Sequence, residues 1–271
     1  MNSEIESALV HSASLHDATM QPWLKPPAMP VQNEAEVHVW RATLDRPPKE
    51  VETYRSMLSP DELLRAERLI FPEHRRRFIV ARGSLRSILA RYLAIAPAAI
   101  RFEYGPHGKP RLDTSHVLAH PLHFNLTHSN DLALFSVTGL GAIGIDIEQI
   151  RPDFSSAQIA KRYFSAGEIE ALGMLAPQEY AEAFFRCWTR KEAFIKATGL
   201  GLSLPLDQFD VTLNPGETAS LLRTAWDPGE AAHWSLRTLE AGKGFAASLA
   251  VRGHGYQVHC WAFALPSQGV N

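Results

Sequence analysis

The chain has 271 residues and a formal net charge of −2, and its 45% hydrophobic and 21% charged residues are ordinary for a globular protein with a full core. The balanced charge argues against a dedicated nucleic-acid-binding protein, which usually carries a strongly basic domain. Cys187 and Cys260 are too few for a disulfide framework, and no apolar run approaches the roughly 20 residues that span a membrane. The N-terminus also lacks the pattern of a secretory signal, so we expect a cytoplasmic protein that binds neither nucleic acid nor membrane.

The first residues, up to about position 35, are predicted to be a poorly ordered extension, because prolines recur between positions 22 and 30 and prevent a continued helix. The alternating segment VHVWRATL, residues 37–44, is a predicted strand. SPDE at residues 59–62 predicts the start of a helix, since it combines a capping serine, a proline in the first helical position and a glutamate that completes an S-x-x-E box. The apolar residues between positions 72 and 93 recur at helical spacing and form one stripe, which predicts a long helix. The same segment carries several arginines, so the predicted helix is basic.

The middle of the chain consists of short segments with strand character. IRFEYG, LHFNLTHS and LALFSVTG are predicted strands, and PHGKP, between the first two of them, is a predicted turn. The segment GAIGIDIEQI, residues 141–150, is predicted to be a buried strand that becomes polar at its end.

The second half repeats the order of helices followed by strands. SAGE at residues 165–168 is a second S-x-x-E start, and a helix is predicted over residues 178–198 with Gly199 as its C-cap. Only strand-like segments follow. We therefore expect an α+β fold of two similar subdomains, residues 36–140 and 141–271, each with helices packed on an antiparallel sheet.

Two acidic residues share one face of the predicted strand GIDIE. Asp146 and Glu148 are two positions apart, so their side chains point to the same side, while the isoleucines between and beside them point to the other. Like charges side by side are unfavourable unless a partner offsets them, and a hard cation is the usual partner. The alternative is a strand end with two solvated acids.

One face of the helix over residues 178–198 carries a second set of polar groups. Trp188, Glu192 and Lys196 follow one another at intervals of four residues and therefore lie on the same face. The indole favours partial burial of that face, so Glu192 needs a partner there. Lys196 is that partner in a plain helical salt bridge. In the other interpretation, Glu192 joins Asp146 and Glu148 around Mg²⁺, with Lys196 beside the metal.

Basic side chains elsewhere suggest a phosphate site. Arg82 and Arg86 lie one turn apart on the basic helix, and Lys109 lies in the GKP turn, where a glycine lets a ligand approach the backbone. The alternative for the arginines is a solvated helix face. Thr127 and His128 end a predicted strand, where a lone histidine is more often structural than catalytic. Zinc is disfavoured because the histidine-rich segment lacks cysteine and fits no common ligand spacing.

Six motifs occur together in the order typical of one family. LSPDE, GKPRL, HFNLTHS, GIDIE, WTRKEAFIKATGLGL and LSLPLDQFDV lie between residues 58 and 211, and through them the sequence resembles the Sfp-type 4′-phosphopantetheinyl transferases. The resemblance implies a monomer of two pseudo-symmetric α+β subdomains with the active site in the cleft between them. It implies an enzyme of the holo-[acyl-carrier-protein] synthase class that binds coenzyme A and Mg²⁺. Such an enzyme moves the phosphopantetheine arm onto a serine of an apo acyl, aryl or peptidyl carrier protein and releases adenosine 3′,5′-bisphosphate.

The resemblance also implies roles for particular residues. Mg²⁺ would be held by Asp146, Glu148 and Glu192, and the catalytic residues would be Glu192 and Lys196. Lys196 would contact the α-phosphate and assist the leaving group, and Glu192 or a metal-bound water would act as the base. Coenzyme A would be bound by Lys109, Thr127 and His128, with Lys191 near the pyrophosphate or on the rim that faces the carrier protein.

One departure from the family pattern concerns the 3′-phosphate of coenzyme A. The lysines that bind it in the surfactin-type enzyme fall on Glu62 and Arg65 in this chain. We expect Lys109 and His128, joined by an arginine of the next helix, Arg82 or Arg86, to bind the 3′-phosphate. Two rival hypotheses are a carrier-protein-binding module without catalysis and an unrelated α+β protein. The intact acids and Lys196 argue against the first, and the joint presence of six motifs argues against the second.

Overall fold

The computed structural model describes residues 22–33, 35–116, 121–154 and 156–265. Helices alternate with strands along the chain, and the predicted α+β class is confirmed. The helices are α1 (Pro48–Arg55), α2 (Pro60–Glu67), α3 (Pro72–Leu93), α4 (Ser156–Tyr163), α5 (Ala166–Gly173) and α6 (Pro177–Thr198). The strands are β1 (Glu36–Thr43), β2 (Phe102–Tyr104), β3 (Pro110–Leu112), β4 (His123–Ser129), β5 (Leu132–Thr138), β6 (Ile143–Gln149), β7 (Phe209–Val211), β8 (Leu221–Thr224), β9 (Trp234–Thr238), β10 (Phe245–Arg252) and β11 (Gln257–Ala262).

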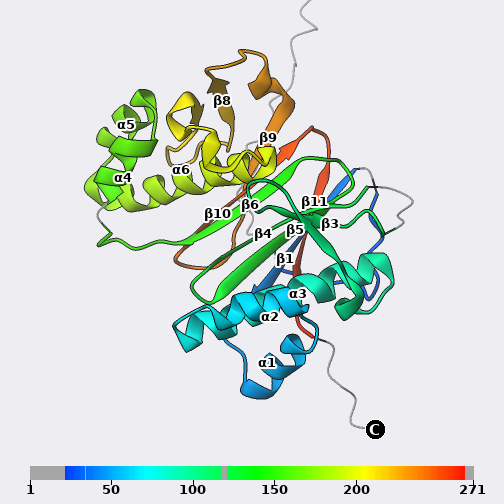
Figure 1. Ribbon diagram of the computed structural model, residues 1–271. Coiled ribbons are helices and arrows are strands. Elements are labelled where there is room, and N and C mark those ends of the chain that lie inside the picture. The colour runs from blue at the N-terminus through cyan, green and yellow to red at the C-terminus, as the bar shows by residue number, and fades with distance from the viewer. Residues whose placement is uncertain (1–21, 34, 117–120, 155, 266–271) are drawn as a thin grey trace, which may run out of the picture.

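The first half is built around a sheet of order β11-β1-β5-β4. Helix α3 lies against one side of this sheet, with α1 and α2 beside it, and Figure 1 shows all three below the strands. Trp40 of β1, Leu85 of α3 and Phe135 of β5 are completely buried in the core between helix and sheet. The sheet is antiparallel except for one pair, because β11 runs parallel to β1. The last strand of the chain therefore lies in the sheet of the first half.

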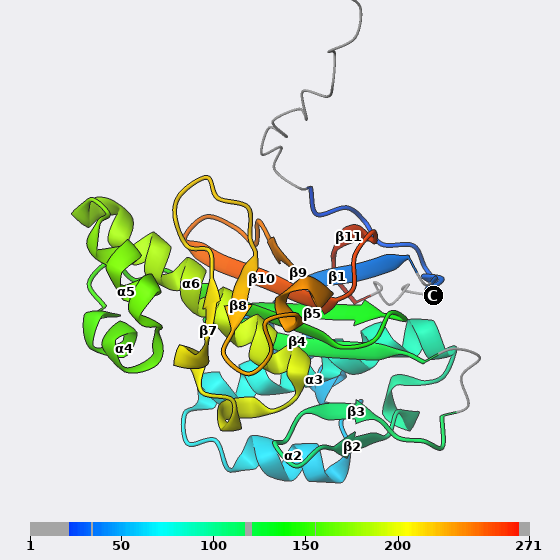
Figure 2. The ribbon, with the colours of Figure 1, turned by 90° about the horizontal axis from the view of Figure 1, so that it is seen from above.

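The second half packs α6 on an antiparallel sheet of order β6-β10-β9. This helix and α3 both have 22 residues, and each is the main helix on its sheet, as the predicted similarity of the two halves requires. Helix α6 lies along β6 and β10, and Figure 2 shows it from above beside β10. A Cβ atom on Gly144 would lie 2.0 Å from the Ala193 carbonyl oxygen, so only glycine permits this close approach of β6 to α6.

The two halves meet where β4 lies beside β6, and side chains provide hydrogen bonds across this boundary. The backbone N–H of Ile145 donates to Oδ1 of Asn125 at 2.9 Å, and the N–H of Gln149 donates to Oγ of Ser129 at 3.0 Å. These contacts satisfy β6 backbone groups that would otherwise be buried without a partner. They also fix which β6 side chains face β4.

The helix ends follow the predicted local rules. Ser59 and Ser165 each begin a helix with a complete capping box, whose glutamates are Glu62 and Glu168. Gly199 ends α6 with a positive φ of 73°, a conformation that glycine adopts without strain. Both S-x-x-E predictions and the C-cap prediction are therefore confirmed.

The N-terminal segment contacts the edge of the first sheet. Leu24 forms a parallel β-bridge with Trp261 of β11, and the Trp23 indole donates a hydrogen bond to the Glu240 carbonyl at 2.7 Å. The Arg41 guanidinium lies over the Trp23 ring. The predicted poorly ordered extension thus includes a stretch attached to the fold, while residues 1–21 and 34 lie outside the described residues. The division of the chain near residue 140 stays a prediction.

Candidate active site

Asp146 is the most deeply buried acid of the site, with an exposed fraction of 3%. Its Oδ1 atom accepts hydrogen bonds from Oγ1 of Thr127 at 3.0 Å and from Nζ of Lys196 at 2.5 Å. Its Oδ2 atom is buried and has no hydrogen-bond partner among the described residues. A buried oxygen without a partner is unfavourable in free energy, and binding of a cation would supply the missing partner.

Glu148 and Glu192 complete an acidic group around Asp146. Burial raises the pKa of Asp146, and Lys196 opposes this rise. Burial and then the charge of Asp146 raise the pKa of both Glu148 and Glu192. The strand and the helix that the sequence could only place separately therefore bring their carboxylates close enough to repel one another.

The chemistry of this acidic group suits a hard divalent cation, because such cations bind carboxylate oxygens. The carboxylates repel one another, and Oδ2 of Asp146 has no hydrogen-bond partner among the described residues. Within the part of the chain that the structure describes, however, no three or more Asp, Glu, His or Cys side chains already form a metal-binding cluster. The nearest positive charge is the ammonium of Lys196, whose side chain is 29% exposed.

The row of side chains on α6 is placed as predicted. Trp188 is partly buried and packs on Phe184 at a ring-centroid distance of 6.2 Å and on the edge of Tyr163 at 6.0 Å. Glu192 and Lys196 continue the same face toward the acids of β6. Trp188 is thus a packing anchor that fixes this face of the helix, and Glu192 and Lys196 project beyond it.

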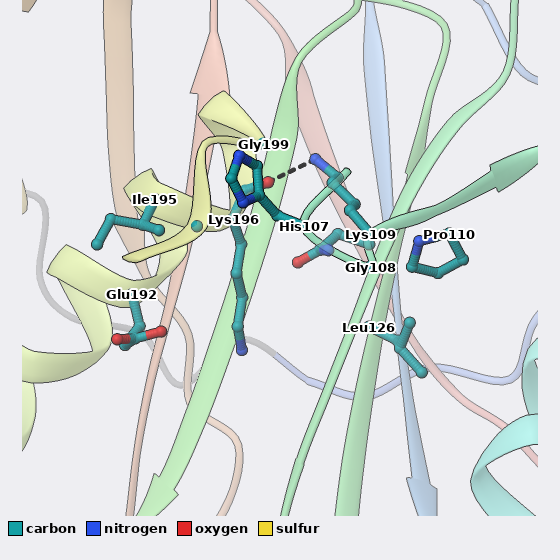
Figure 3. Close-up of a pocket in the computed structure, with 11 residues that line it drawn as sticks. His107, Gly108, Lys109, Pro110, Leu126, Glu192, Ile195, Lys196 and Gly199 are labelled. Carbon is teal, nitrogen blue, oxygen red and sulfur yellow. Dashed lines mark hydrogen bonds between the residues drawn. The ribbon is translucent and has the colours of Figure 1, made fainter. Parts of the chain in front are cut away.

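A pocket of about 250 Å³ lies next to Glu192 and Lys196, between the two halves of the chain. Figure 3 shows it between the end of α6 and the turn that contains His107 and Gly108. Pro110 and Leu126 of the first half also line it. The expected position of the site, in a cleft between the two subdomains, agrees with this arrangement.

Lys109 lines the pocket with its stem, but its ammonium points to backbone carbonyls. Nζ donates to the carbonyl of Ile143 at 3.0 Å and to that of Lys196 at 2.5 Å, the latter drawn in Figure 3. Burial lowers the pKa of Lys109 to about 8. Carbonyls at the end of a helix attract a cation, so this contact joins the turn of the first half to the end of α6.

Thr127 and His128 are adjacent on β4 but differ in their surroundings. Thr127 is buried between Asp146 and Lys196, and its Oγ1 accepts a hydrogen bond from Lys196 at 3.2 Å. His128 is exposed on the opposite side of the strand. Loss of solvation and then the charge of Lys196 lower the pKa of His128, as do Arg77 and His74 of α3.

Arg82 and Arg86 do not form the predicted phosphate site. Both are buried, and both bind Glu62: Arg82 contacts Oε1 at 2.5 Å and Arg86 contacts Oε2 at 2.6 Å. Arg86 also donates to the carbonyl of Ile100 at 2.9 Å. Although burial opposes its ionisation, the two arginines lower the pKa of Glu62. The prediction is corrected because these guanidinium groups fix α2 against α3 and are withdrawn from ligands.

Lys191 is also a structural residue, and its predicted place near the pyrophosphate or on the rim is wrong. Its exposed fraction is 0%, and its ammonium pairs with Glu168 at 2.7 Å. It donates further to the carbonyls of Leu206 and Phe209 at 2.8 and 2.6 Å. Lys191 precedes Glu192 by one position, so it points roughly 100° away around the helix, toward the core.

Ser129 and Asn125 belong to the site but were missed. Both contact β6, and Ser129 donates from Oγ to Oε2 of Glu148 at 2.9 Å. A signal was available, because Asn125, Thr127 and Ser129 alternate along β4 and so share one face. What the sequence did not show is that this face lies against β6.

A cleft between two α+β halves, with acids from a strand of one half and a pocket lined by both, is the kind of site that group-transfer enzymes build. Comparison with known proteins gives the family. The model of the family described as "4′-phosphopantetheinyl transferase superfamily" matches residues 142–250, and the model described as "4′-phosphopantetheinyl transferase, N-terminal" matches residues 40–138. The chain belongs to the 4′-phosphopantetheinyl transferases.

Individual relatives agree with this assignment. The chain is 42% identical over 242 residues to 4′-phosphopantetheinyl transferase HetI of Nostoc sp., covering 89% of this chain and 98% of that protein. It is 34% identical over 180 residues to 4′-phosphopantetheinyl transferase Sfp of Bacillus subtilis, covering 66% of this chain and 77% of that protein. Among solved structures, Thermotoga maritima holo-[acyl-carrier-protein] synthase matches with a TM-score of 0.33 and 22% identity over 41% of this chain and 62% of that one.

The family membership confirms the resemblance and the transferase class predicted from the sequence. Among the described residues, none of the helices has the length and apolar character needed to cross a membrane. The roles of the individual site residues are taken up below as proposals.

Proposed function

We propose that this enzyme transfers the phosphopantetheine arm of coenzyme A to a serine of an apo acyl, aryl or peptidyl carrier protein, with Mg²⁺ bound at the acidic group. The observation that carries the proposal is the placement of Asp146, Glu148 and Glu192 beside a pocket built by both halves of a phosphopantetheinyl transferase. We propose that a monomer is the active form, as the resemblance implies.

Mg²⁺ would be held by Asp146, Glu148 and Glu192 and would neutralise charge on the pyrophosphate of coenzyme A. Lys196 now provides that positive charge at Asp146. A cation held by these acids would supply that positive charge instead, and the ammonium of Lys196 could then bind a phosphate oxygen. We assign it to the leaving side of the pyrophosphate.

The reaction needs one proton transfer and one phosphoryl transfer. The serine oxygen of the carrier protein forms a bond to the phosphorus that bears the pantetheine, and the bond from that phosphorus to the bridging oxygen breaks. Adenosine 3′,5′-bisphosphate leaves with the electron pair, stabilised by Lys196. We assign the acceptance of the serine proton to Glu192, the carboxylate of the acidic group that lies on α6 beside the pocket.

Coenzyme A would occupy the pocket between the β2–β3 turn and the end of α6. We propose Thr127 and Lys109 as its contacts, since Thr127 lies beside the acids and Lys109 lines the pocket. The role of His128, which is exposed on the opposite side of β4, stays a prediction. Lys109 would have to exchange its carbonyl partners for a phosphate oxygen. With Arg82 and Arg86 withdrawn, the exposed Arg65 is an alternative for the 3′-phosphate.

The direct test is incubation of the protein with coenzyme A, Mg²⁺ and an apo carrier protein, followed by intact-mass measurement. The carrier should gain the mass of one phosphopantetheine group, and chelation of divalent cations should prevent the gain. A panel of apo carriers from fatty-acid, polyketide and peptide pathways would identify the pathway served. Binding of a carrier without any gain in mass would instead support the non-catalytic module.

Replacement of Lys196 by alanine is expected to lower kcat by about a hundred-fold and to change the KM for coenzyme A much less, because charge on the leaving oxygen grows toward the transition state. Steady-state kinetics at saturating Mg²⁺ checks this, and replacement of the exposed Lys161 on α4 is the matched control. A change confined to KM would reassign Lys196 to ground-state binding of the phosphates.

A further inference from the structure

Ser129 makes two hydrogen bonds that together determine the direction of its hydroxyl proton. The backbone N–H of Gln149 donates to its Oγ at 3.0 Å, which occupies an acceptor position of the oxygen. The same Oγ lies 2.9 Å from Oε2 of Glu148. A carboxylate can only accept, so the hydroxyl proton points to Glu148.

The contact between Thr127 and Asp146 repeats this arrangement two residues earlier on each of the strands β4 and β6. Thr127 accepts from Lys196 and donates to Oδ1 of Asp146 at 3.0 Å. Each of the two acids on β6 therefore has one oxygen bound by a hydroxyl from β4. The second oxygen of Asp146 is buried and unpartnered, and no donor from the described residues reaches Oε1 of Glu148.

We propose that Ser129 is a positioning residue: it binds one oxygen of Glu148 so that the other is presented to the divalent cation, as Thr127 does for Asp146. The inference rests on the proposed function, because it takes Glu148 as a metal ligand. A carboxylate that rotates freely must be ordered when a metal binds, whereas one already held by a hydrogen bond is ordered in advance. Ser129 touches neither the substrate nor the reacting atoms in this assignment.

The test compares two substitutions at this position. Ser129→Ala removes the hydroxyl, and Ser129→Thr keeps it on a side chain that suits a strand. Ser136→Ala is the matched control, because Ser136 is a buried strand serine on β5 whose Oγ has no hydrogen-bond partner. Mn²⁺ binding in the presence of coenzyme A is measured by electron paramagnetic resonance, and the Mg²⁺ dependence of transfer is measured in parallel.

Ser129→Ala should weaken Mn²⁺ binding by about ten-fold, the effect of one hydrogen bond to a charged group. It should raise the Mg²⁺ concentration for half-maximal transfer in the same proportion and leave the KM for coenzyme A at saturating Mg²⁺ unchanged. Ser129→Thr and Ser136→Ala should stay within about two-fold of wild type in both measurements. Ser129→Ala should also unfold at a lower temperature, because the Gln149 N–H loses its acceptor.

Three results overturn the inference: Mn²⁺ binding by Ser129→Ala equal to wild type, an equal loss in Ser129→Thr, or a lower unfolding temperature of Ser129→Ala as its only change. Absence of Mn²⁺ binding in the wild type overturns it together with the metal assignment. The proposed function fails separately, if wild-type protein that binds Mn²⁺ and coenzyme A modifies no carrier protein. In that case the binding measurements still decide the role of Ser129.

Discussion

Asp146→Asn is expected to reduce the rate of phosphopantetheinyl transfer by about a thousand-fold or more, since a metal that neutralises a pyrophosphate supplies several kcal/mol in the transition state. The amide has the shape of the carboxylate and can still accept the hydrogen bond from Thr127. It has no charge with which to bind a cation or Lys196. The fold should survive, because the substitution removes a charge from a buried position, and the Lys196 ammonium that loses its partner is partly exposed to solvent.

The measurement is the initial rate of carrier modification, with circular dichroism and thermal unfolding to establish that the variant is folded. Glu148→Gln and Glu192→Gln are expected to behave in the same way. Glu170→Gln, at an exposed position of α5, is the control and should retain full activity. If Asp146→Asn kept more than about a tenth of the wild-type rate at low Mg²⁺, the assignment of Asp146 as a metal ligand would be wrong.

Gly144→Ala should destabilise the protein by about 3 kcal/mol or more, although the change adds a single methyl group. That group would lie 2.0 Å from the Ala193 carbonyl oxygen and 2.4 Å from the Ala197 backbone nitrogen. Both are main-chain atoms of α6, so no side-chain rotation relieves the overlap. The strand that carries Asp146 would have to move away from the helix that carries Glu192 and Lys196.

Urea unfolding measures this loss. Gly173→Ala in α5 is the matched control, since a Cβ atom there meets nothing within 4 Å and alanine is the better helix former. The Gly144 variant should also lose transfer activity under conditions where it is still folded. A stability within about 1 kcal/mol of wild type would mean that β6 and α6 can separate at little cost, and that their close contact is not what aligns the acids.

The parts of the site that depend on local periodicity could be predicted from the sequence. Asp146 and Glu148 share a face because a strand has a period of two, and Glu192 and Lys196 share one because a helix repeats about every four residues. Capping serines and Gly199 likewise act through their immediate neighbours, which is why the starts of α2 and α5 and the end of α6 were predicted closely. Helices α1 and α4 were not predicted.

The errors concern basic residues whose partners are distant in sequence. Arg82 lies 20 residues from Glu62, and Lys191 lies 23 residues from Glu168, so nothing near them indicates a buried ion pair. Helical spacing alone does not tell a phosphate-binding arginine from one that joins two helices. The resemblance implies a lysine at the position of Glu62, and in this chain Arg82 and Arg86 neutralise the glutamate instead.

The parallel pairing of β1 with β11 has a consequence for how the chain acquires its structure. Residues 36–43 are synthesised long before their partner, residues 257–262. Until β11 is available, β1 is an edge strand whose backbone N–H and C=O groups on that side are unpaired, and such a strand can pair with another chain. A fragment that ended near residue 140 would keep this edge permanently. The two halves are therefore poor candidates for separate expression, and the first sheet is complete only after residues 257–262 have left the ribosome.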